Sequence, residues 1–333
     1  MEEYHNNHSS GLGKGAVYTT DGPVTMMEQS GQREQSRWLM GYATCCGCYC
    51  CIFIVIIILA VALGANNDDD KEDNGPPKDL LLDFYNATGW SLNWSSSTDV
   101  CEDWEGVHCF DDFSKFILNL SYLSLGGSIP SEIGLLAESG IFELGLSNCY
   151  IGGSIPSEIG RLAALENLDL PFNEITGSIP SEIGLLTNLK RIGLLWNNIT
   201  ESIPSEIGLL SNLDSLYLSS NSLVGTLPTE TGLMRGLYLL SMERNSLTGS
   251  VPSEIGQLKI LRDFRINNNV LTGTLPSEIG LLKNLGGFFI RSNNLSGSIP
   301  AEFTNLNGVT MYLPCMTGTI PAGINCIVNV DDC

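Results

Sequence analysis

The sequence predicts an α/β solenoid, a right-handed superhelix of stacked coils with one concave parallel β-sheet, preceded by one N-terminal transmembrane helix. Three observations support this fold: a proline-containing element recurs about every 24 residues, leucines hold fixed places within each period, and a charge-free apolar run precedes the repeats. The predicted segments are a disordered cytosolic tail (1–40), the transmembrane helix (41–65), an acidic linker (66–78), an N-terminal cap (79–112), about nine repeats (113–321) and a C-terminal cap (322–333).

The repeats are defined by the element Gly-Ser-Ile-Pro-Ser-Glu-Ile-Gly and its close variants. Its prolines run from Pro130 to Pro321, with one gap of 26 residues, six gaps of 24 and one of 21. One unit reads Leu162-x-x-Leu165-x-x-Leu168-x-Leu170-x-x-Asn173-x-Ile175-x-Gly177-x-Ile179-Pro180. Because a single coil cannot bury its own leucines, such a period predicts coils that stack and share one continuous core.

Within a unit, each residue type predicts a local structure. The alternation around Leu168 and Leu170 predicts a short strand with two inward side chains. The following Asn turns the chain and satisfies backbone groups that the turn buries. The Gly permits a tight bend, and the Pro precedes a short helical or 3₁₀ turn. Stacked coils should therefore carry an asparagine ladder, formed by Asn173, Asn197, Asn221, Asn245, Asn269 and Asn293.

Departures from the unit are few. The ladder position holds Leu123 in the first unit, Cys149 in the second and Pro314 in the last, and terminal repeats are usually atypical. Glu201 stands where the other units have Gly. We expect it to distort one bend mildly, unless that turn avoids positive φ.

One segment determines the predicted compartment. No charged residue occurs from Gly41 to Ala65, and about 20 apolar residues are enough to cross a bilayer core. A cleavable signal peptide ending near Ala65 is the alternative. Because a long polar tail comes first instead of a short basic leader, an uncleaved signal anchor is favoured. The Lys and Arg counts on the two sides are close to a tie and do not fix the orientation.

Cysteines and glycosylation triplets indicate the orientation instead. Cysteines at the start of the apolar run are candidates for S-acylation, or are small apolar residues on a helix face; they are Cys45, Cys46, Cys48, Cys50 and Cys51. The Asn-x-Ser/Thr triplets all follow the run, at Asn86, Asn93, Asn119, Asn198 and Asn294. Together with the cysteines of the repeat region, they suit an oxidising, glycosylating compartment. We therefore predict a single-pass protein of the plasma membrane or an endomembrane, with its repeats on the extracytosolic side.

The repeat unit resembles that of the plant-type leucine-rich-repeat family over roughly residues 79–333. The resemblance includes the amphipathic stretch Asp79–Tyr85 and the cap-like sequence Cys101-Glu-Asp-Trp-Glu-Gly-Val-His-Cys109. It implies disulfides between Cys101 and Cys109 and between Cys326 and Cys333, with the pairing of Cys149 and Cys315 left open. In the family's receptor kinases the repeats come first, then the span, then a kinase. Here the span precedes the repeats and we expect no kinase.

Composition argues against two function classes. The formal net charge of −21 should repel phosphate backbones, so nucleic acid is not expected as a partner. His5 and His8 lie in the tail, and His108 adjoins the predicted cap disulfide, where a structural role is favoured. No nucleophile elbow, zincin helix or carboxylate pair stands out. We therefore predict no catalysis, no cofactor and no metal site.

A ligand-binding surface is predicted on the concave face. Its outward strand positions are rich in aromatic and Arg side chains, the types that dominate interface hot spots; cross-strand packing is the alternative reason for them. Arg244, Arg265 and Arg291 fall in neighbouring units and suggest a basic strip for an anionic or carboxylate-bearing ligand. The predicted site consists of Tyr122, Asp169, Phe172, Trp196, Tyr217, Glu243, Arg244, Arg265, Phe289 and Arg291.

The resemblance implies a recognition protein. We expect it to bind a protein, peptide or glycan ligand on the concave face, as a receptor-like or co-receptor component held to the membrane by its single span. The alternative is a structural or adhesion protein of the cell surface or wall without a specific signalling ligand. A cytosolic scaffold is a third possibility, which intact disulfides or a glycosylated Asn294 would exclude. The sequence makes no prediction of the oligomeric state.

Overall fold

A computed structural model describes residues 77–92, 94–95, 97, 99–110, 115–306, 308–313 and 325–328. The chain divides into two units, residues 1–71 and 72–333, and the described residues belong to the second. The predicted tail, the transmembrane helix with its cysteines and most of the linker lie outside the described residues, as do Asn93, Pro314, Cys315 and Cys333. No helix within the described ranges is both long enough and apolar enough to span a membrane.

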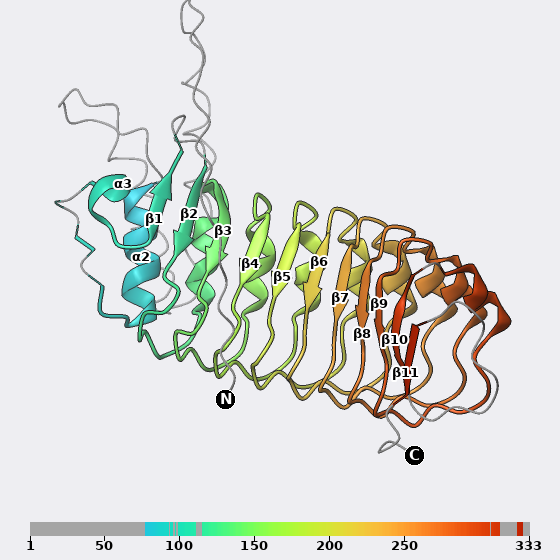
Figure 1. Ribbon diagram of the computed structural model, residues 1–333. Helices are drawn as coiled ribbons and strands as arrows, with labels where there is room; N and C mark the ends of the chain where they lie inside the picture. The colour runs from blue at the N-terminus through green and yellow to red at the C-terminus, as the bar shows by residue number, and fades with distance from the viewer. Residues whose placement is uncertain are drawn as a thin grey trace, which may run out of the picture. The chain divides into compact units, whose positions relative to one another are not determined.

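The described coils share one sheet whose strands follow chain order (Figure 1). Strand β1 (Val107–Cys109) pairs antiparallel with β2 (Phe116–Asn119), and β2 to β11 form ten parallel strands. The parallel sheet is as predicted, whereas the antiparallel first strand was not anticipated. The later strands are β3 (Ile141–Gly145), β4 (Asn167–Asp169), β5 (Arg191–Gly193), β6 (Ser215–Tyr217), β7 (Leu239–Ser241), β8 (Asp263–Arg265), β9 (Gly287–Phe289), β10 (Thr310–Leu313) and β11 (Asn325–Val328).

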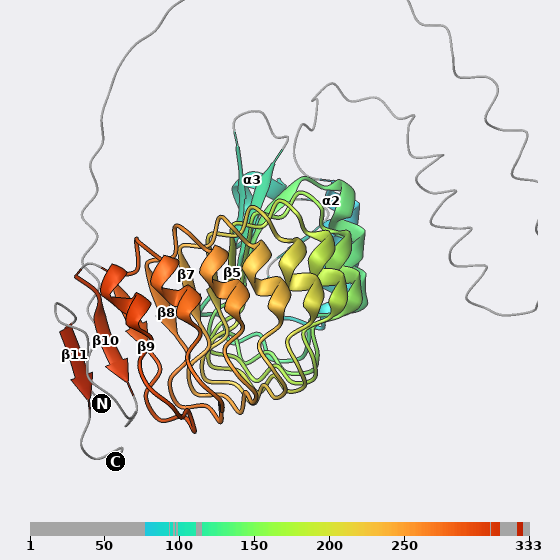
Figure 2. The same cartoon turned by 90° about the vertical axis from the view of Figure 1, so that its right-hand side faces the viewer.

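Short 3₁₀ helices lie side by side opposite the sheet (Figure 2). Each follows a proline whose φ lies between −58° and −80°, the range that the proline ring imposes. The predicted helical turn is thereby confirmed for the prolines from Pro130 to Pro300, while Pro321 lies outside the described residues. These helices are η2 (Ser131–Glu138), η3 (Ser157–Arg161), η4 (Ser181–Leu185), η5 (Ser205–Leu209), η6 (Thr229–Leu233), η7 (Ser253–Gln257), η8 (Ser277–Leu281) and η9 (Ala301–Asn305).

The core lies between the sheet and the helices. In the coil of strand β4, the Leu and Ile residues at the inward positions of the repeat unit are at most 3% exposed, whereas Leu185 is 61% exposed. Burying each such side chain stabilises the fold by about 1.5–3 kcal/mol before the entropy of ordering the chain is counted. The buried set is Leu165, Leu168, Leu170, Ile175, Ile179, Ile183 and Leu186.

The predicted asparagine ladder is confirmed. The Asn197 amide nitrogen donates to the carbonyl oxygens of Leu170 (3.0 Å) and Leu194 (3.1 Å), and its side-chain oxygen accepts from the Ile175 backbone N–H (3.0 Å). One ladder asparagine therefore ties its own coil to the coil before it. The corresponding side-chain bonds recur at Asn173, Asn221, Asn245, Asn269 and Asn293.

Cys149 replaces asparagine in this ladder. Its buried thiol donates to the carbonyl oxygens of Leu120 (3.1 Å) and Ser147 (3.3 Å), while its backbone N–H donates to the side-chain oxygen of Asn173. Burial raises the pKa of the thiol, although bonds to the Leu123 and Tyr122 backbones oppose the shift. The thiol thus performs part of the asparagine's structural role in its neutral form.

The bend at Glu201 differs from the expectation. Glu201 adopts φ +61°, close to the glycines at the same position, and the Val224 N–H still donates to its carbonyl oxygen over 3.0 Å. The bend therefore keeps its geometry. The destabilising effect is instead the backbone strain of a non-glycine residue in the left-handed region. The expected distortion of the turn was wrong.

The N-terminal cap contains α2 (Lys78–Thr88) and α3 (Val100–Asp103). Helix α2 covers the stretch predicted to be amphipathic and buries Leu81 and Phe84. Cys101 and Cys109, the pair expected to bridge, form a disulfide that joins α3 to β1.

Three tryptophans organise this cap, and one of them, Trp90, bonds to the first coil. Trp94 stacks on Trp104 with ring centroids 4.7 Å apart. The indole N–H of Trp90 donates to the Gly126 carbonyl oxygen (3.0 Å), and that of Trp94 donates to the Glu105 carbonyl oxygen (3.1 Å). The cap therefore covers the apolar end of the solenoid and satisfies the polar atoms of its aromatic side chains.

Candidate functional site

The predicted site residues lie in rows that run across the coils on the sheet side. The strand row consists of the last residues of β4 to β9, which pair in register from Asp169 through Tyr217 and Arg265 to Phe289. Glu243 and Arg291 lie two residues beyond the strand row, on the same side of the alternation. The turn row consists of the residues that precede the ladder position in the coils from Leu123 to Asn293, namely Tyr122, Asn148, Phe172, Trp196, Ser220, Arg244, Asn268 and Ser292.

All residues of the turn row adopt the left-handed conformation, with φ between +53° and +67°. This region disfavours bulky side chains, yet Tyr122, Phe172 and Trp196 occupy it. Backbone outliers of this kind concentrate at functional sites, where the surrounding structure fixes them. The turn row is therefore a candidate for function on geometry alone.

Phe172, Trp196 and Arg244 form an aromatic cluster within the turn row. The Phe172 and Trp196 rings stack with centroids 6.3 Å apart, and the Arg244 guanidinium lies 5.9 Å from the Trp196 ring. Phe172 is 51% exposed and Trp196 is 50% exposed, so the cluster is preorganised without being buried. Tyr122, 77% exposed at the N-terminal end of the row, is not part of it.

The strand row is held by ion pairs. The Arg191 Nε donates to Asp169 Oδ1 over 2.9 Å, and its guanidinium lies 4.6 Å from the Tyr217 ring. Burial alone would lower the pKa of Arg191, but the hydrogen bond and charge of Asp169, with a further contribution from Tyr217, outweigh it and raise the pKa. Asp169 and Tyr217, both predicted site residues, are thus joined through an arginine that the sequence analysis missed.

The predicted basic strip requires a correction. Arg265 donates two hydrogen bonds to Asp263, over 2.9 and 2.6 Å, and stacks on Phe289 at 5.1 Å. The hydrogen bond to Asp263 raises the pKa of Arg265 against the opposing effect of burial. Because Asp263 neutralises it, Arg265 does not contribute free positive charge to a strip.

Two of the three predicted arginines carry exposed charge. Within the part of the chain that the structure describes, neither Arg244 nor Arg291 takes part in an ion pair. Both are exposed, and they are separated by the coil that contains the neutralised Arg265. Of the three arginines predicted for the strip, Arg244 and Arg291 therefore keep a charge that no described carboxylate neutralises.

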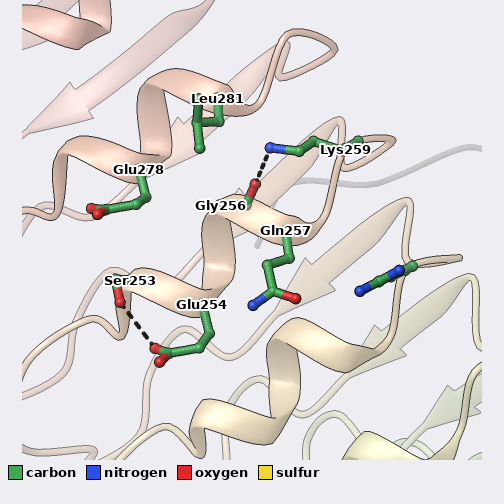
Figure 3. Close-up of a pocket in the computed structure, with 8 residues that line it drawn as sticks. Ser253, Glu254, Gly256, Gln257, Lys259, Glu278 and Leu281 are labelled. Atoms are coloured by element: carbon green, nitrogen blue, oxygen red, sulfur yellow. Dashed lines mark hydrogen bonds between the residues drawn. The ribbon is translucent and has the colours of Figure 1, made fainter.

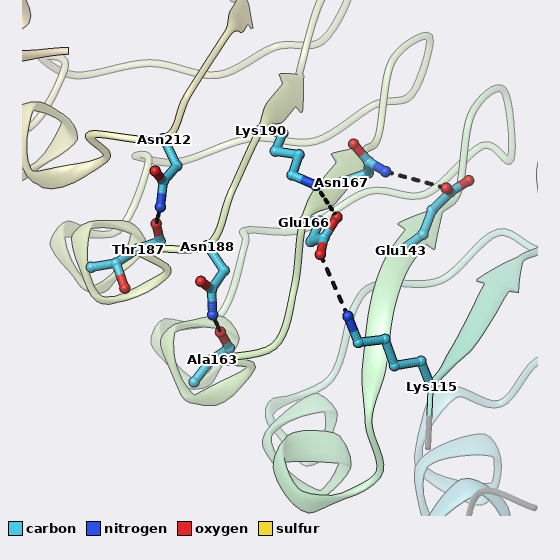
Figure 4. A network of polar contacts seen from close by, with 9 residues as sticks. All are labelled: Lys115, Glu143, Ala163, Glu166, Asn167, Thr187, Asn188, Lys190 and Asn212. Carbon is cyan, nitrogen blue, oxygen red and sulfur yellow. Dashed lines mark hydrogen bonds and ion pairs between the residues drawn. The ribbon is translucent and has the colours of Figure 1, made fainter. Parts of the chain in front are cut away.

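The sequence analysis did not predict a polar network near the N-terminal ends of strands β2 to β5 (Figure 4). Glu166 forms ion pairs with Lys190 (2.6 Å) and with Lys115 (3.6 Å). The Asn167 amide nitrogen donates a hydrogen bond to the Glu143 carboxylate. The hydrogen bond from Lys190 is the main reason why the pKa of Glu166 is lowered; burial opposes it. Glu166 and Lys190 are 24 residues apart, which is one repeat period. The period could therefore have predicted that the two side chains lie at the same place in adjacent coils.

The glycosylation triplets within the described residues are accessible. Asn86, Asn119, Asn198 and Asn294 are exposed, although the Asn119 side-chain oxygen accepts a hydrogen bond from the Ser121 backbone. Asn198 and Asn294 each follow a ladder asparagine, so they lie outside the strand row and the turn row. Glycosylation there remains a prediction.

The geometry agrees with sequence and structure comparisons. A family model for the leucine-rich repeat matches residues 141–162, 164–186 and 212–234. The fold is a leucine-rich-repeat solenoid. No curated protein matches the chain.

Several of the similar solved structures are plant receptor ectodomains. That of the Arabidopsis thaliana membrane receptor kinase GASSHO1/SCHENGEN3, in complex with CASPARIAN STRIP INTEGRITY FACTOR 2, is 29% identical over 75% of this chain and 32% of its own, with a TM-score of 0.68. The plant peptide hormone receptor RGFR1, in complex with RGF2, is 34% identical over 63% of this chain and 34% of its own, with a TM-score of 0.60.

The ectodomain of the Arabidopsis receptor kinase HAESA, in complex with an IDA peptide hormone ligand, is also similar. It is 26% identical over 75% of this chain and 47% of its own, with a TM-score of 0.63. The chain therefore spans between about a third and a half of the length of these ectodomains. Their fold is one that typically binds ligands rather than one that catalyses reactions.

Proposed function

We propose that this leucine-rich-repeat protein recognises an extended peptide or protein segment along the turn row and strand row of its sheet. The observation that supports the proposal is the aromatic cluster of Phe172, Trp196 and Arg244, which is preorganised, half exposed and held on strained backbone. Trp, Tyr and Arg are the side chains that most often carry binding energy at protein interfaces. The peptide ligands of the similar ectodomains support the same class of ligand.

Charge adds a second element to the proposed recognition. Arg244 lies at the aromatic cluster and Arg291 lies two coils further along the chain, and neither is neutralised by a carboxylate of the described residues. A guanidinium favours planar anionic groups such as carboxylates. The proposed ligand therefore combines an apolar or aromatic side chain for the cluster with a carboxylate for one arginine.

Anchoring is the second part of the proposal. We propose that residues 41–65 hold the repeats on the extracytosolic side of a membrane, as a receptor-like or co-receptor component. Tags at both ends, protease protection on intact cells and glycosidase treatment would test it. Protection of the N-terminal tag alone, with a glycosidase-sensitive mass shift, is expected. Protection of the C-terminal tag without any glycosidase-sensitive mass shift would contradict it.

Ligand recognition can be tested with the full-length chain in detergent against a displayed library of extended peptides. For peptides that bind saturably, Trp196→Ala should weaken binding by about tenfold or more, which corresponds to at least about 1.4 kcal/mol. Thr187→Ala, at an exposed residue outside both rows, is the control and should leave affinity unchanged. Equal affinities for both variants would exclude the aromatic cluster as the site. Absence of any saturable peptide would favour the structural or adhesion alternative.

A further inference from the structure

The side of the solenoid opposite the sheet carries an exposed column of leucines. Leu185, Leu209 and Leu233 are the last residues of η4, η5 and η6, which belong to consecutive coils, and they are 61%, 56% and 50% exposed. Their chain neighbours Leu186 and Leu210 are fully buried, so the core does not require the exposed leucines. Contiguous exposed apolar side chains, unlike scattered ones, mark interaction surfaces.

A column of glutamates runs beside the leucine column. Glu182, Glu206 and Glu230 each stand three residues before an exposed leucine, and side chains at that spacing eclipse one another in a 3₁₀ helix. Each carboxylate accepts a hydrogen bond of 3.1–3.2 Å from the Ser or Thr hydroxyl that precedes it. None of the ion pairs formed by the described residues involves one of these glutamates.

The leucine column is interrupted at η7, where Gln257 takes the leucine position before Leu281 resumes it in η8. An open hollow of about 420 Å³ lies at the interruption (Figure 3). Its lining carries both signs of charge: Glu254 and Glu278 contribute carboxylates, and Arg235 and Lys259 contribute cations. The Lys259 ammonium donates to the Gly256 carbonyl oxygen and is held at its own coil. The purely apolar and acidic part of this side therefore ends at the hollow.

We propose that the leucine and glutamate columns of η4 to η6 form a docking surface for a basic amphipathic helix of a partner protein. Coils stack about 4.8 Å apart at the sheet, and on the helical side adjacent coils also touch, since a methyl group at Gly184 would lie 2.6 Å from the Glu206 carbonyl oxygen. Residues three or four apart in an α-helix advance about 4.5–6 Å along its axis. A helix lying across the coils thus presents one apolar side chain per coil, and Lys or Arg beside that stripe faces the glutamates. Its polar end reaches the hollow at Gln257, where both signs of charge are available.

Other occupants fit this surface less well. The glutamate column repels the phosphates of anionic lipids and of nucleic acids. A second copy of this chain would need a basic amphipathic helix. Helix α2, the longest helix of the described residues, is acidic in its first turn and buries Leu81 and Phe84 in its own cap. The charge and the spacing of the two columns therefore favour a basic helix from another protein.

The test uses the full-length chain and a fluorescent synthetic helix with leucines every three or four residues and lysines beside them. Leu185→Gln, Leu209→Gln and Leu233→Gln are combined in one variant, because Gln257 shows that the coil accepts glutamine at this position. Val224→Thr is the matched control: Val224 is 43% exposed on another face, and Thr200 and Thr248 hold its position in the adjacent coils. Fluorescence anisotropy measures the affinity at two salt concentrations.

Saturable binding that falls at least tenfold in the triple variant, persists in Val224→Thr and weakens with salt is expected. Equal binding of a scrambled peptide of the same composition would overturn the proposal, because it would show charge attraction without docking. Self-association that the triple variant abolishes would also overturn it, since a second copy would then be the occupant. The triple variant should leave capture of peptides at Trp196 unchanged, so this proposal and the proposed function can fail separately.

Discussion

Asn197 satisfies three backbone groups that its coil would otherwise bury without partners. It is 6% exposed and bonds to the backbones of Leu170, Ile175 and Leu194. A buried donor or acceptor that loses its partner costs about 1–3 kcal/mol. At the scale of single residues, the ladder therefore stabilises the turns that carry the candidate site, because Trp196 directly precedes Asn197.

Replacing Asn197 by Ala should lower the free energy of unfolding by about 3 kcal/mol, since three buried backbone groups lose partners at once. Urea denaturation measures the change. Asn188→Ala is the control, because Asn188 is exposed and donates one hydrogen bond to the Ala163 carbonyl oxygen (Figure 4). This substitution should lower the free energy of unfolding by no more than about 0.5 kcal/mol. Similar losses for both variants would mean that ladder asparagines contribute no more than surface ones.

The residues of the turn row show where prediction from the sequence stopped. The period placed Phe172 and Trp196 on the correct face, and both are exposed there. Their left-handed backbone was not predictable, because the residue types argue against it and only the ladder behind them imposes it. The prediction that Arg265 contributes to a basic strip was wrong for a simpler reason. Asp263 and Arg265 are two residues apart on one strand, so alternation placed them on the same face, but the pairing was overlooked.

At the scale of elements, the period predicted strands, 3₁₀ helices and bends because every coil meets the same neighbours. The period could not predict the structure of the cap. Strand β1 pairs antiparallel with β2, and no repeat constrains it. The bend at Glu201 belongs to this scale as well, because its backbone follows the neighbouring coils rather than its own residue type.

Glu201→Gly should therefore stabilise the protein by about 1 kcal/mol, because glycine relieves the left-handed strain at φ +61°. Thermal unfolding should show a rise in Tm of a few degrees. Thr200→Gly, at the adjacent residue with no positive φ, should lower Tm instead. A lower Tm for Glu201→Gly would show that the Glu201 side chain contributes more than its backbone costs.

At the scale of the whole repeat unit, the two sides have separate roles. The sheet side offers aromatic rings and two free arginines, and the helical side offers leucines and glutamates. Opposite chemistry on opposite sides would allow an anionic ligand and a basic partner to bind one solenoid together. Such a solenoid is stabilised by nearest-neighbour contacts, so a disturbance at one end should not reach the other.

The cap disulfide provides the test of that locality. Replacing Cys101 and Cys109 by Ser removes a short closed loop, worth about 2–3 kcal/mol in the chain-entropy description. Hydrogen exchange followed by mass spectrometry should show faster exchange from α2 to β3, because the cap, with Trp90, loses its fixed position over the first coil. Strands β6 to β8 should keep their protection, since each coil depends on its immediate neighbours. Uniform loss of protection along the sheet would instead mean that the coils unfold as one cooperative unit, and that the binding surface on the middle coils depends on an intact cap.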